Sequence, residues 1–427
     1  MALVVKNGRL INPATGEDKI CDIRIDGTKI TAIGPDVDLQ DADILDATGL
    51  VVTPGLIDMH VHLRQPGQSA KETIESGTKA AAAGGFTRVA TMPNTKPVID
   101  SAIIVDGLKY KIADEGVVKV DIIGSLSKGL EGKELSSMGG MAKAGVVAFS
   151  DDGRYVQNCD FMRKAMEYAG MFGKIVIDHC EDADLIEGGH MHEGVVSHEL
   201  GLKGRPAVAE DIAVARDILL AEATGTAVHI AHISTKNAVQ MVRQAKAKGL
   251  KVTAEATPQH MILTDEALRS YDPRFKVNPP LRSEEHRKAV VEGLVDGTID
   301  AIVTDHAPHT IEEKDCEFSL APSGFVGLET SLGTVLTYLY HTGTVDLMTL
   351  IRTMTSSPAA LLGVDAGNVA VGKTADLTIM DLNKEWTVDS DKFYSKGKST
   401  PFEDMILKGK AVATIVDGKI VMKDGEV

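Results

Sequence analysis

The sequence predicts an α/β protein: a (β/α)8 TIM-like barrel with a small β-sandwich domain formed from both chain termini. Between residues 55 and 362, eight short apolar segments alternate with segments of helical periodicity. Nearly continuous apolar runs are typical of parallel strands that are buried on both faces by helices. At residues 1–54 and 363–427, short apolar runs instead alternate with turn-forming dipeptides, which indicates a separate small sheet.

The apolar segments of the central region have the length and spacing of barrel strands. The expected strands are Leu56–His62, Arg88–Met92, Val120–Ser125, Val146–Phe149, Ile175–His179, Val228–His232, Lys251–Glu255 and Ala301–Asp305. The clearest helical segments between them are Glu72–Ala83, Asp160–Ala169, Glu210–Thr224 and Thr235–Lys248. An open doubly wound sheet is the alternative, but no GxGxxG motif follows the first strand.

Both chain ends show strands separated by tight turns. The expected strands are Leu3–Lys6, Ile23–Ile25, Thr31–Ile33, Leu377–Met380, Ala413–Val416 and Ile420–Met422. The pairs Asn7-Gly8, Asp26-Gly27 and Asp417-Gly418 predict hairpin turns, because these residue types tolerate positive φ. Neither end is long enough to form a stable sheet alone, so we expect the two ends to pair.

Charge, cysteine spacing and hydropathy exclude several classes of protein. The chain has 427 residues and a net charge of −16, which argues against a nucleic-acid partner. Its four cysteines lack CxxC spacing, which suits a reducing compartment better than a disulfide framework or a cysteine-based zinc site. The N-terminus turns polar too early for a signal peptide, and no apolar run reaches the ~18 residues of a membrane span. We therefore expect a cytoplasmic protein without a membrane partner.

The first barrel segment carries a pair of histidines around which the predicted site is organised. It reads Thr53-Pro-Gly-Leu-Ile-Asp-Met-His-Val-His-Leu-Arg64. Because side chains alternate along a strand, His60 and His62 point to the same side and can bind one zinc ion. A bare HxH pair is more often two surface or hydrogen-bonded histidines. Other residues of the sequence are therefore needed to distinguish a metal site from this alternative.

Histidines and aspartates recur at the ends of other predicted strands. The candidate metal ligands are His60, His62, Asp152, His179, His232 and Asp305. The carboxyl ends of barrel strands meet at one mouth, so these side chains should converge. One catalytic zinc takes about three protein ligands, so six ligands fit two metal ions that share a carboxylate and a hydroxide. Asp305 could then move a proton between the attacking water and the leaving nitrogen. Polar residues that merely mark strand ends would explain one or two of these positions.

The remaining histidines receive weaker interpretations. His190 and His192 form a second HxH pair, but in a glycine-rich stretch, and we interpret them as surface residues. We expect His229 to pack in the core. No role is assigned to His260, His286 and His341, which have no partner at a strand end.

Seven stretches match motifs of one enzyme family. They are Pro54–Arg64, Met92–Thr95, Phe149–Gly153, His179–Glu181, His232–Thr235, Asn278–Arg282 and Thr304–His309. The first and last occur in looser form in hydantoinases and allantoinases. The combination of His-Leu-Arg, Met-Pro-Asn-Thr and Asn-Pro-Pro-Leu-Arg is specific to dihydroorotases. The whole chain therefore resembles the class I dihydroorotases of the amidohydrolase superfamily.

The resemblance implies an activity and a metal centre. The implied reaction is the reversible cyclisation of N-carbamoyl-L-aspartate to L-dihydroorotate with loss of water, the third step of de novo pyrimidine biosynthesis. It implies two Zn²⁺ ions per subunit, one bound by His60 and His62 and one by His179 and His232. Asp152 and hydroxide would bridge them, with zinc-bound hydroxide as the nucleophile. Asp305 would be both a ligand and the general acid/base.

The same resemblance implies the substrate contacts. The planar guanidinium of Arg64 can hold the substrate carboxylate with two hydrogen bonds. The other implied contacts are His62, Asn94, Asn278, His309, Ser323 and Gly324. Relatives often carry an aromatic residue where this chain has Ser323, so any stacking contribution at that position is in doubt. Without the family, Arg64 would be read as an ion-pair partner of an acid such as Asp58, and Asn94 as a turn residue.

Two other functions are compatible with parts of the pattern. A hydantoinase- or allantoinase-like cyclic amidase generally uses a carboxylated lysine where Asp152 stands, and a non-catalytic scaffold for aspartate transcarbamoylase should have lost metal ligands. The partners that we expect are a small-molecule substrate, a second copy of the chain in a homodimer, and potentially aspartate transcarbamoylase.

Overall fold

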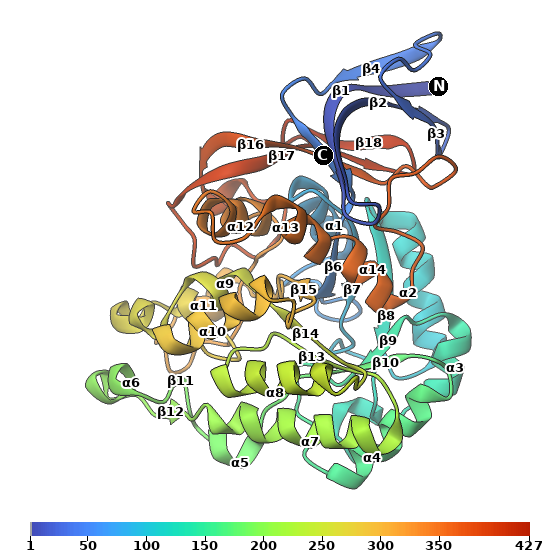
Figure 1. Ribbon diagram of the computed structural model, residues 1–427. Coiled ribbons are helices and arrows are strands. Elements are labelled where there is room, and N and C mark those ends of the chain that lie inside the picture. Colours follow the sequence, from blue (N-terminus) through green and yellow to red (C-terminus); the bar gives the residue numbers. More distant parts are fainter. Residues whose placement is uncertain (1) are drawn as a thin grey trace.

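The computed structural model describes residues 2–427 and contains a barrel and a small β-sheet (Figure 1). The predicted fold class is confirmed: a nearly closed barrel of parallel strands is joined to a sheet made from both chain ends. The strands of the two termini lie side by side at one end of the molecule, although most of the chain separates them in sequence (Figure 1).

Eight parallel strands form the barrel, in the same order in space as in sequence. They are β6 (Leu56–Val61), β7 (Phe86–Thr91), β8 (Lys119–Gly124), β9 (Ala148–Ser150), β10 (Ile175–Asp178), β13 (Val228–Ile230), β14 (Val252–Ala256) and β15 (Ala301–Ile302). A parallel bridge between Val61 and His306 brings the chain after β15 back to β6. The first and last strand ends are therefore neighbours, as the convergence of their side chains requires.

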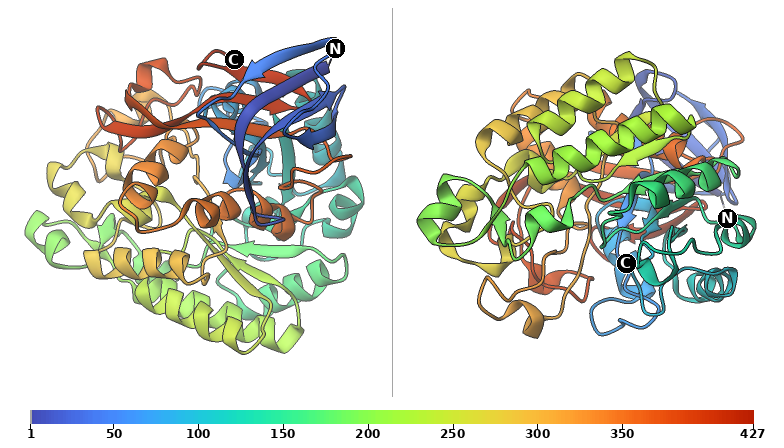
Figure 2. Two further views of the ribbon diagram at one scale, coloured as in Figure 1. Left: turned by 45° about the horizontal axis from the view of Figure 1, so that its top comes forward. Right: turned by 90° about the horizontal axis from the view of Figure 1, so that it is seen from below.

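Helices cover the outside of the barrel and follow its strands in turn. The helices are α1 (Ile74–Ala83), α2 (Ala102–Glu115), α3 (Met138–Ala144), α4 (Cys159–Gly170), α7 (Val208–Thr224), α8 (Lys236–Ala247), α10 (Glu284–Val295), α12 (Ser331–Val335), α13 (Leu347–Thr353) and α14 (Ser356–Leu362). Local chemistry fixes several starts: the side chains of Thr73, Asn158 and Thr235 each accept a hydrogen bond from the first turn of a helix. Figure 2 shows α7 and α8 on the side of the barrel opposite the small sheet.

Several strands end earlier than the sequence predicts, and this matters for the site. We expected strands through His232 and Asp305, but β13 ends at Ile230 and β15 at Ile302. His232 and Asp305 have positive φ angles of 29° and 51°. Such conformations are uncommon for residues other than glycine and are often found at functional sites. Here they turn the chain out of the sheet at the barrel mouth.

The strands of the chain termini form one eight-stranded sheet, in which β4 branches from β1. Its members are β1 (Ala2–Asn12), β2 (Glu17–Asp26), β3 (Lys29–Gly34), β4 (Ala42–Asp46), β5 (Val51–Pro54), β16 (Leu377–Thr387), β17 (Ile406–Val416) and β18 (Lys419–Lys423). The pairing of β5 with β16 joins the two chain ends, and a shared core that includes Leu10, Ile23 and Leu377 lies between them.

The turn predictions at the chain ends are mostly confirmed. Asp26-Gly27 connects β2 to β3, and Asp417-Gly418 connects β17 to β18. The predicted turn at Asn7-Gly8 is wrong, because β1 runs through it with a shift in register. Asn7 has a φ of 60°, and its backbone N–H donates to Asp22. A dipeptide that tolerates positive φ suits a bulge as well as a hairpin.

The division of the chain into segments 1–54, 55–362 and 363–427 remains a proposal.

Among residues 2–427, no helix is both long and apolar enough to cross a lipid bilayer.

The joint between the chain ends can be tested by a core substitution. Leu377 is fully buried and pairs with Pro54 on one side and Ile415 on the other. We expect Leu377→Ala to lower the free energy of unfolding by about 2–5 kcal/mol, because it leaves a cavity. Urea unfolding measures the change. The control is Ile420→Ala on the edge strand β18, where the side chain is 38% exposed and the loss should be about 1 kcal/mol or less.

Candidate metal centre and active site

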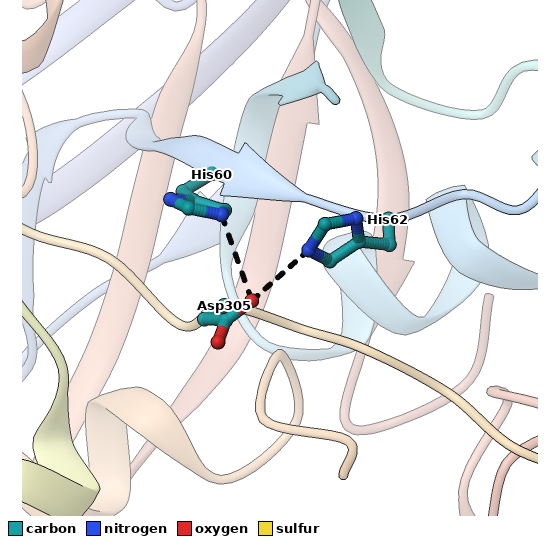
Figure 3. Close-up of side chains that lie close together, drawn as sticks. All are labelled: His60, His62 and Asp305. Carbon is teal, nitrogen blue, oxygen red and sulfur yellow. Dashed lines mark hydrogen bonds and ion pairs between the residues drawn. The ribbon is translucent and has the colours of Figure 1, made fainter. Parts of the chain in front are cut away.

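The end of β6 presents two imidazoles to the barrel mouth. Figure 3 shows His60 and His62 projecting from the same side of this strand toward Asp305. Asp58 fixes the backbone beneath them: its Oδ1 accepts the N–H of His60, and its Oδ2 accepts the N–H of Thr304, each at 3.0 Å. One buried carboxylate thus ties the first strand end to the segment that carries Asp305.

Asp152 lies at the centre of four histidines. Its Oδ2 is 3.4 Å from Nε2 of both His60 and His62. Its Oδ1 is 3.3 Å from His179 Nδ1 and 3.4 Å from His232 Nε2. Each carboxylate oxygen therefore faces a different pair of imidazoles, which is the arrangement of a carboxylate that bridges two metal ions.

Asp305 completes the first of these groups. Its Oδ1 is 3.1 Å from His62 Nε2 and 3.6 Å from His60 Nε2, the two contacts drawn in Figure 3. The six predicted ligands are all buried, with no residue more than 7% exposed. The structure therefore brings together every side chain that the strand-end pattern selected as a ligand.

Two features of the group fit a metal ion. His60 Nε2 and Asp152 Oδ1 are buried and have no hydrogen-bond partner among residues 2–427, although buried polar atoms normally have one. Two ligands that bind one zinc at about 2.0–2.1 Å in a tetrahedron lie about 3.3 Å apart. The nitrogen–oxygen distances of 3.3 and 3.4 Å around Asp152 match that spacing better than a hydrogen bond of about 2.9 Å.

The electrostatics of the group also favour a cation. Burial alone lowers the pKa of His179, but the carboxylates of Asp152 and Glu181 outweigh it and raise that pKa to about 9. Burial likewise opposes protonation of His60, yet Asp152 and Glu255 raise its pKa well above the usual value. The negative charge at this position therefore attracts protons in the bare protein and would attract a metal cation in their place.

A second acidic cluster lies next to the site, but an arginine already occupies it. Asp178 and Asp217 approach Cys180 closely enough for a shared cation. The guanidinium of Arg216 occupies this space, at 2.8 Å from Asp178 and 2.7 Å from Asp217. We assign no metal to this cluster.

A pocket of about 260 Å³ opens at this group, and five of the six candidate ligands, all except His60, line it. The other residues that line it are Arg64, Asn94, Gly153, Tyr155, Arg205, Asn278, Ala307, His309, Ser323 and Gly324. Every substrate contact implied by the sequence therefore lies on the same pocket as the metal ligands.

Arg64 supplies a positive charge to this pocket. It is 8% exposed, and its Nε donates to the carbonyl of Pro308 at 3.1 Å. Burial lowers the pKa of Arg64 to about 10, so the guanidinium stays charged at neutral pH. Its Nη1 and Nη2 form no hydrogen bond with residues 2–427 and are free to bind an anionic group of a ligand.

Asn94 orients the candidate ligand His62 as well as lining the pocket. Its Oδ1 lies 2.8 Å from His62 Nδ1, so this nitrogen carries the proton and Nε2 is left with its lone pair toward Asp152 and Asp305. A side chain at residue 153 would displace Asn94, because a Cβ on Gly153 would lie 2.4 Å from Asn94 Nδ2.

Asn278 and His309 are in the pocket but have partners within the protein. The amide nitrogen of Asn278 donates to Tyr155 at 2.7 Å and to Glu181 at 3.0 Å. His309 donates from Nε2 to the carbonyl of Ser323 at 3.0 Å, and burial next to Arg64 lowers its pKa to about 3. Both side chains therefore shape the wall of the pocket as well as offering polar atoms to it.

Two buried lysines hold the loop that carries Ser323 and Gly324. Lys276 donates to the carbonyls of Phe318 and Ser319 at 2.7 and 2.9 Å. Lys314, in the short helix α11 (Ile311–Lys314), donates to the carbonyls of Pro322 and Gly324 at 3.0 and 2.9 Å. The segment after Asp305 is thus held against the pocket by both lysines.

Sequence reasoning missed four polar residues at the site. These are Tyr155, Glu181, Arg205 and Glu255. Glu255 ends the seventh predicted strand, so the rule that selected the other strand ends would also have found it. Arg205 carries no such signal in the sequence. It belongs to the short strand β12 (Gly204–Arg205), and its guanidinium donates to Asn278 Oδ1 at a distance of 2.5 Å.

The interpretation of His192 as a surface residue is wrong. It belongs to the short strand β11 (Met191–His192), which pairs with β12, and it is 6% exposed. Its ring packs against His286 and lies 3.4 Å from Arg282. His190, the other member of the pair, is half-buried. The glycine-rich local sequence does not predict β11, because this strand is stabilised by pairing with β12 further along the chain. The expectation for His229 is correct, since it is fully buried.

Comparison with known proteins identifies the family. Residues 49–238 match the model described as dihydro-orotase-like, and residues 323–422 match the amidohydrolase family. A dihydroorotase of Pelotomaculum thermopropionicum is 53% identical over 99% of both chains. The chain belongs to the dihydroorotase family. A dihydroorotase of Geobacter metallireducens is 51% identical and covers 99% of this chain and 100% of its own.

Solved structures extend the relationship to other cyclic amidohydrolases. The L-hydantoinase of Arthrobacter aurescens superimposes with a TM-score of 0.90 at 28% identity, covering 100% of this chain and 97% of its own. The dihydropyrimidinase of Brevibacillus agri gives a TM-score of 0.88 at 24% identity, covering 100% and 96%, and shows the shared fold. This member of the dihydroorotase family is therefore a hydrolase of the cyclic amidohydrolase type.

The two loop lysines predict a pH dependence of stability. Burial lowers the pKa of Lys276 and of Lys314 to about 8, against 10.5 for a free lysine. Between these pH values the unfolded chain binds more protons than the folded protein, so the stability contributed by each group rises with pH. We expect the stability of the wild type relative to Lys314→Met to increase from pH 8 to pH 10, measured by urea unfolding. The same substitution at the exposed Lys133 is the control, and an equal change there would contradict the prediction.

Proposed function

We propose that this protein is a zinc-dependent dihydroorotase that interconverts N-carbamoyl-L-aspartate and L-dihydroorotate, with loss of water on ring closure. One observation carries the proposal beyond the family: a buried cationic group, Arg64, lines the same pocket as five of the six convergent candidate ligands. The substrate presents the matching features, a carboxylate next to a cyclic amide. This reaction would make the protein the third enzyme of de novo pyrimidine biosynthesis.

We propose two zinc ions for the centre. His60, His62 and Asp305 would hold the first ion, and His179 and His232 the second, with Asp152 between them. The distances of each Asp152 oxygen to its own pair of imidazoles support this assignment. The nitrogen and oxygen donor set is suited to zinc. When bound, the ions would polarise the amide carbonyl and make water nucleophilic at neutral pH.

Asp305 would act as the general acid/base. Burial opposes ionisation of its carboxyl group, but His62, His60 and His232 hold its pKa below the usual value, so the group is a base at neutral pH. In the direction of hydrolysis it would take a proton from the attacking water and give it to the ring nitrogen that leaves. In the direction of ring closure the same carboxylate would carry the proton the opposite way.

Substrate binding would divide between the two ends of the pocket. Arg64 would hold the exocyclic carboxylate through Nη1 and Nη2, and Asn94 and His309 lie beside it on the pocket wall. Asn278 and the backbone at Ser323-Gly324 would hold the ureide edge of the ring. The serine side chain offers no aromatic surface, so this contact would depend on the backbone.

We also propose that the protein works as a cytoplasmic homodimer and that it can associate with aspartate transcarbamoylase. Size-exclusion chromatography of the pure protein, alone and with aspartate transcarbamoylase, tests both assemblies. The net charge of −16 supports the absence of a nucleic-acid partner.

The proposed role of Arg64 predicts a loss of activity without a loss of metal. Arg64→Ala should lower kcat/KM for dihydroorotate by about 10²–10³-fold, because a buried charged pair with the substrate is worth about 2–5 kcal/mol. Zinc content should remain that of the wild type. Assays of the wild type with hydantoin and allantoin test the alternative amidase functions. Arg163→Ala, on the exposed face of α4, is the control. Unchanged turnover by Arg64→Ala would remove this residue from the site.

The proposed bridge predicts a loss of metal. Asp152→Asn should reduce bound zinc from two equivalents per chain to one or fewer, since the neutral amide replaces a charged ligand shared by both ions. Metal analysis after dialysis measures this. Removal of zinc by a chelator should abolish turnover in the wild type, and readdition should restore it. Two tightly bound ions in Asp152→Asn would rule out the bridging role.

A further inference from the structure

A row of hydrogen-bonded, buried polar side chains, here called the file, crosses the interior of the barrel below the proposed metal centre. It runs from Thr253 through His229 and Glu255 to His60. Thr253 Oγ1 lies 2.8 Å from His229 Nδ1, and His229 Nε2 lies 3.1 Å from Glu255 Oε2. Glu255 Oε1 lies 2.6 Å from His60 Nδ1. The reaction proposed above uses only the last of these residues.

Glu255 contacts a ligand-bearing segment on each side of the proposed metal pair. Besides His60 Nδ1, its Oε1 accepts the backbone N–H of His232 at 3.3 Å. The residue is fully buried on β14, which lies between β13 and β15 in the barrel. Burial of a carboxylate without partners is costly, and this one has two imidazoles and a backbone amide as partners.

The acceptor character of a carboxylate fixes the direction of every bond in the file. Each oxygen of the Glu255 carboxylate faces an imidazole nitrogen, Oε1 at 2.6 Å from His60 and Oε2 at 3.1 Å from His229. An ionised carboxylate can only accept, so His229 donates from Nε2 and receives the hydroxyl hydrogen of Thr253 at Nδ1. His60 likewise donates from Nδ1. The lone pair of His60 Nε2 is therefore directed toward Asp152 and Asp305.

His60 differs from His62, which directly follows β6, in the charge of its partner. His62 donates from Nδ1 to the neutral amide oxygen of Asn94, whereas His60 donates to a carboxylate. A carboxylate that accepts the second N–H of an imidazole fixes the tautomer and makes the other nitrogen a stronger metal ligand. Of these two imidazoles, His60 is therefore the more strongly polarised ligand.

The contact with His232 serves a different purpose. His232 has a φ of 29°, outside the regions that L-residues normally adopt. Such a conformation persists only where neighbouring groups hold it. Glu255 Oε1 provides one such contact to the backbone N–H of His232, and the ring then reaches Asp152 at 3.4 Å.

We propose that Glu255, oriented by His229, is a positioning residue that fixes the tautomer and ligand strength of His60 and the backbone of His232, and so sets the zinc affinity of the centre. The inference rests on the proposed zinc site. It makes the file part of the metal-binding machinery, whereas a purely structural polar network would contribute only to the stability of the barrel.

Glu255→Gln separates the two roles. Glutamine has the same shape and can still accept from His60 and donate to His229, whose other nitrogen would then donate to Thr253. The substitution therefore removes the charge and preserves the hydrogen bonds. We expect zinc to bind about 10–100-fold more weakly than in the wild type. Competition with a fluorescent zinc chelator measures this, and thermal unfolding of the metal-free proteins measures the stability of the fold.

His229→Gln is the second variant, because glutamine can donate to Glu255 and accept from Thr253 without an aromatic ring. We expect His229→Gln to weaken zinc binding as well, but by a smaller factor than Glu255→Gln does. Cobalt in place of zinc gives a spectroscopic readout, since altered ligand strength at His60 should shift the visible bands of Glu255→Gln. Glu329→Gln is the matched control, because Glu329 accepts hydrogen bonds from the backbone N–H groups of Tyr394 and Ser395. The zinc affinity of this variant should equal that of the wild type.

The outcomes separate this inference from the proposed function. Weaker zinc binding by Glu255→Gln, with metal-free stability close to that of Glu329→Gln, supports the positioning role. Wild-type zinc affinity and cobalt spectrum in both Glu255→Gln and His229→Gln would overturn it and leave the zinc site intact. A wild-type protein that binds no zinc would overturn the metal site and this inference together.

Discussion

The burial of Asp152 among four imidazoles is the constraint on which the rest of the site depends. A carboxylate removed from water is costly unless opposite charge or hydrogen-bond donors surround it. Asp152 meets this requirement with two histidines from the end of β6 and one from each of two other strand ends. Those histidines need partners of their own, and Glu255, Asn94 and Glu181 supply them. Three of the four histidines around Asp152 are therefore held in turn by polar side chains outside them.

The scaffold holds these layers by short connections. Only Gly55 separates β5 of the small sheet from β6 of the barrel, and its N–H donates to Asp376 from the other end of the chain. A Cβ at this position would lie 2.0 Å from Thr87 Oγ1, so the close approach of the small sheet to the barrel requires glycine. The segment that carries the two candidate metal-binding histidines is thus anchored at its start by the small sheet and further along by Asp58.

The pocket also resolves an electrostatic problem. The chain carries a net charge of −16, yet its proposed substrate is an anion. The positive charge of Arg64 and Arg205 lies on the pocket wall, and the proposed zinc ions would add more. The groups that line a cleft determine the field inside it more than the net charge of the molecule does. Binding and catalysis are therefore compatible with an acidic surface.

Short-range patterns in the sequence determined the barrel, the pairing of the chain ends and the six candidate ligands. The side-chain alternation that aligns His60 with His62 needs only local geometry, and so does the placement of polar groups at strand ends. Tertiary structure alone decided which carboxylate meets which imidazole: Glu255 and His60 are 195 positions apart. It also buried His192 and turned Asn7-Gly8 into a bulge. These outcomes depend on contacts between segments distant in the chain, and local periodicity carries no information about such contacts.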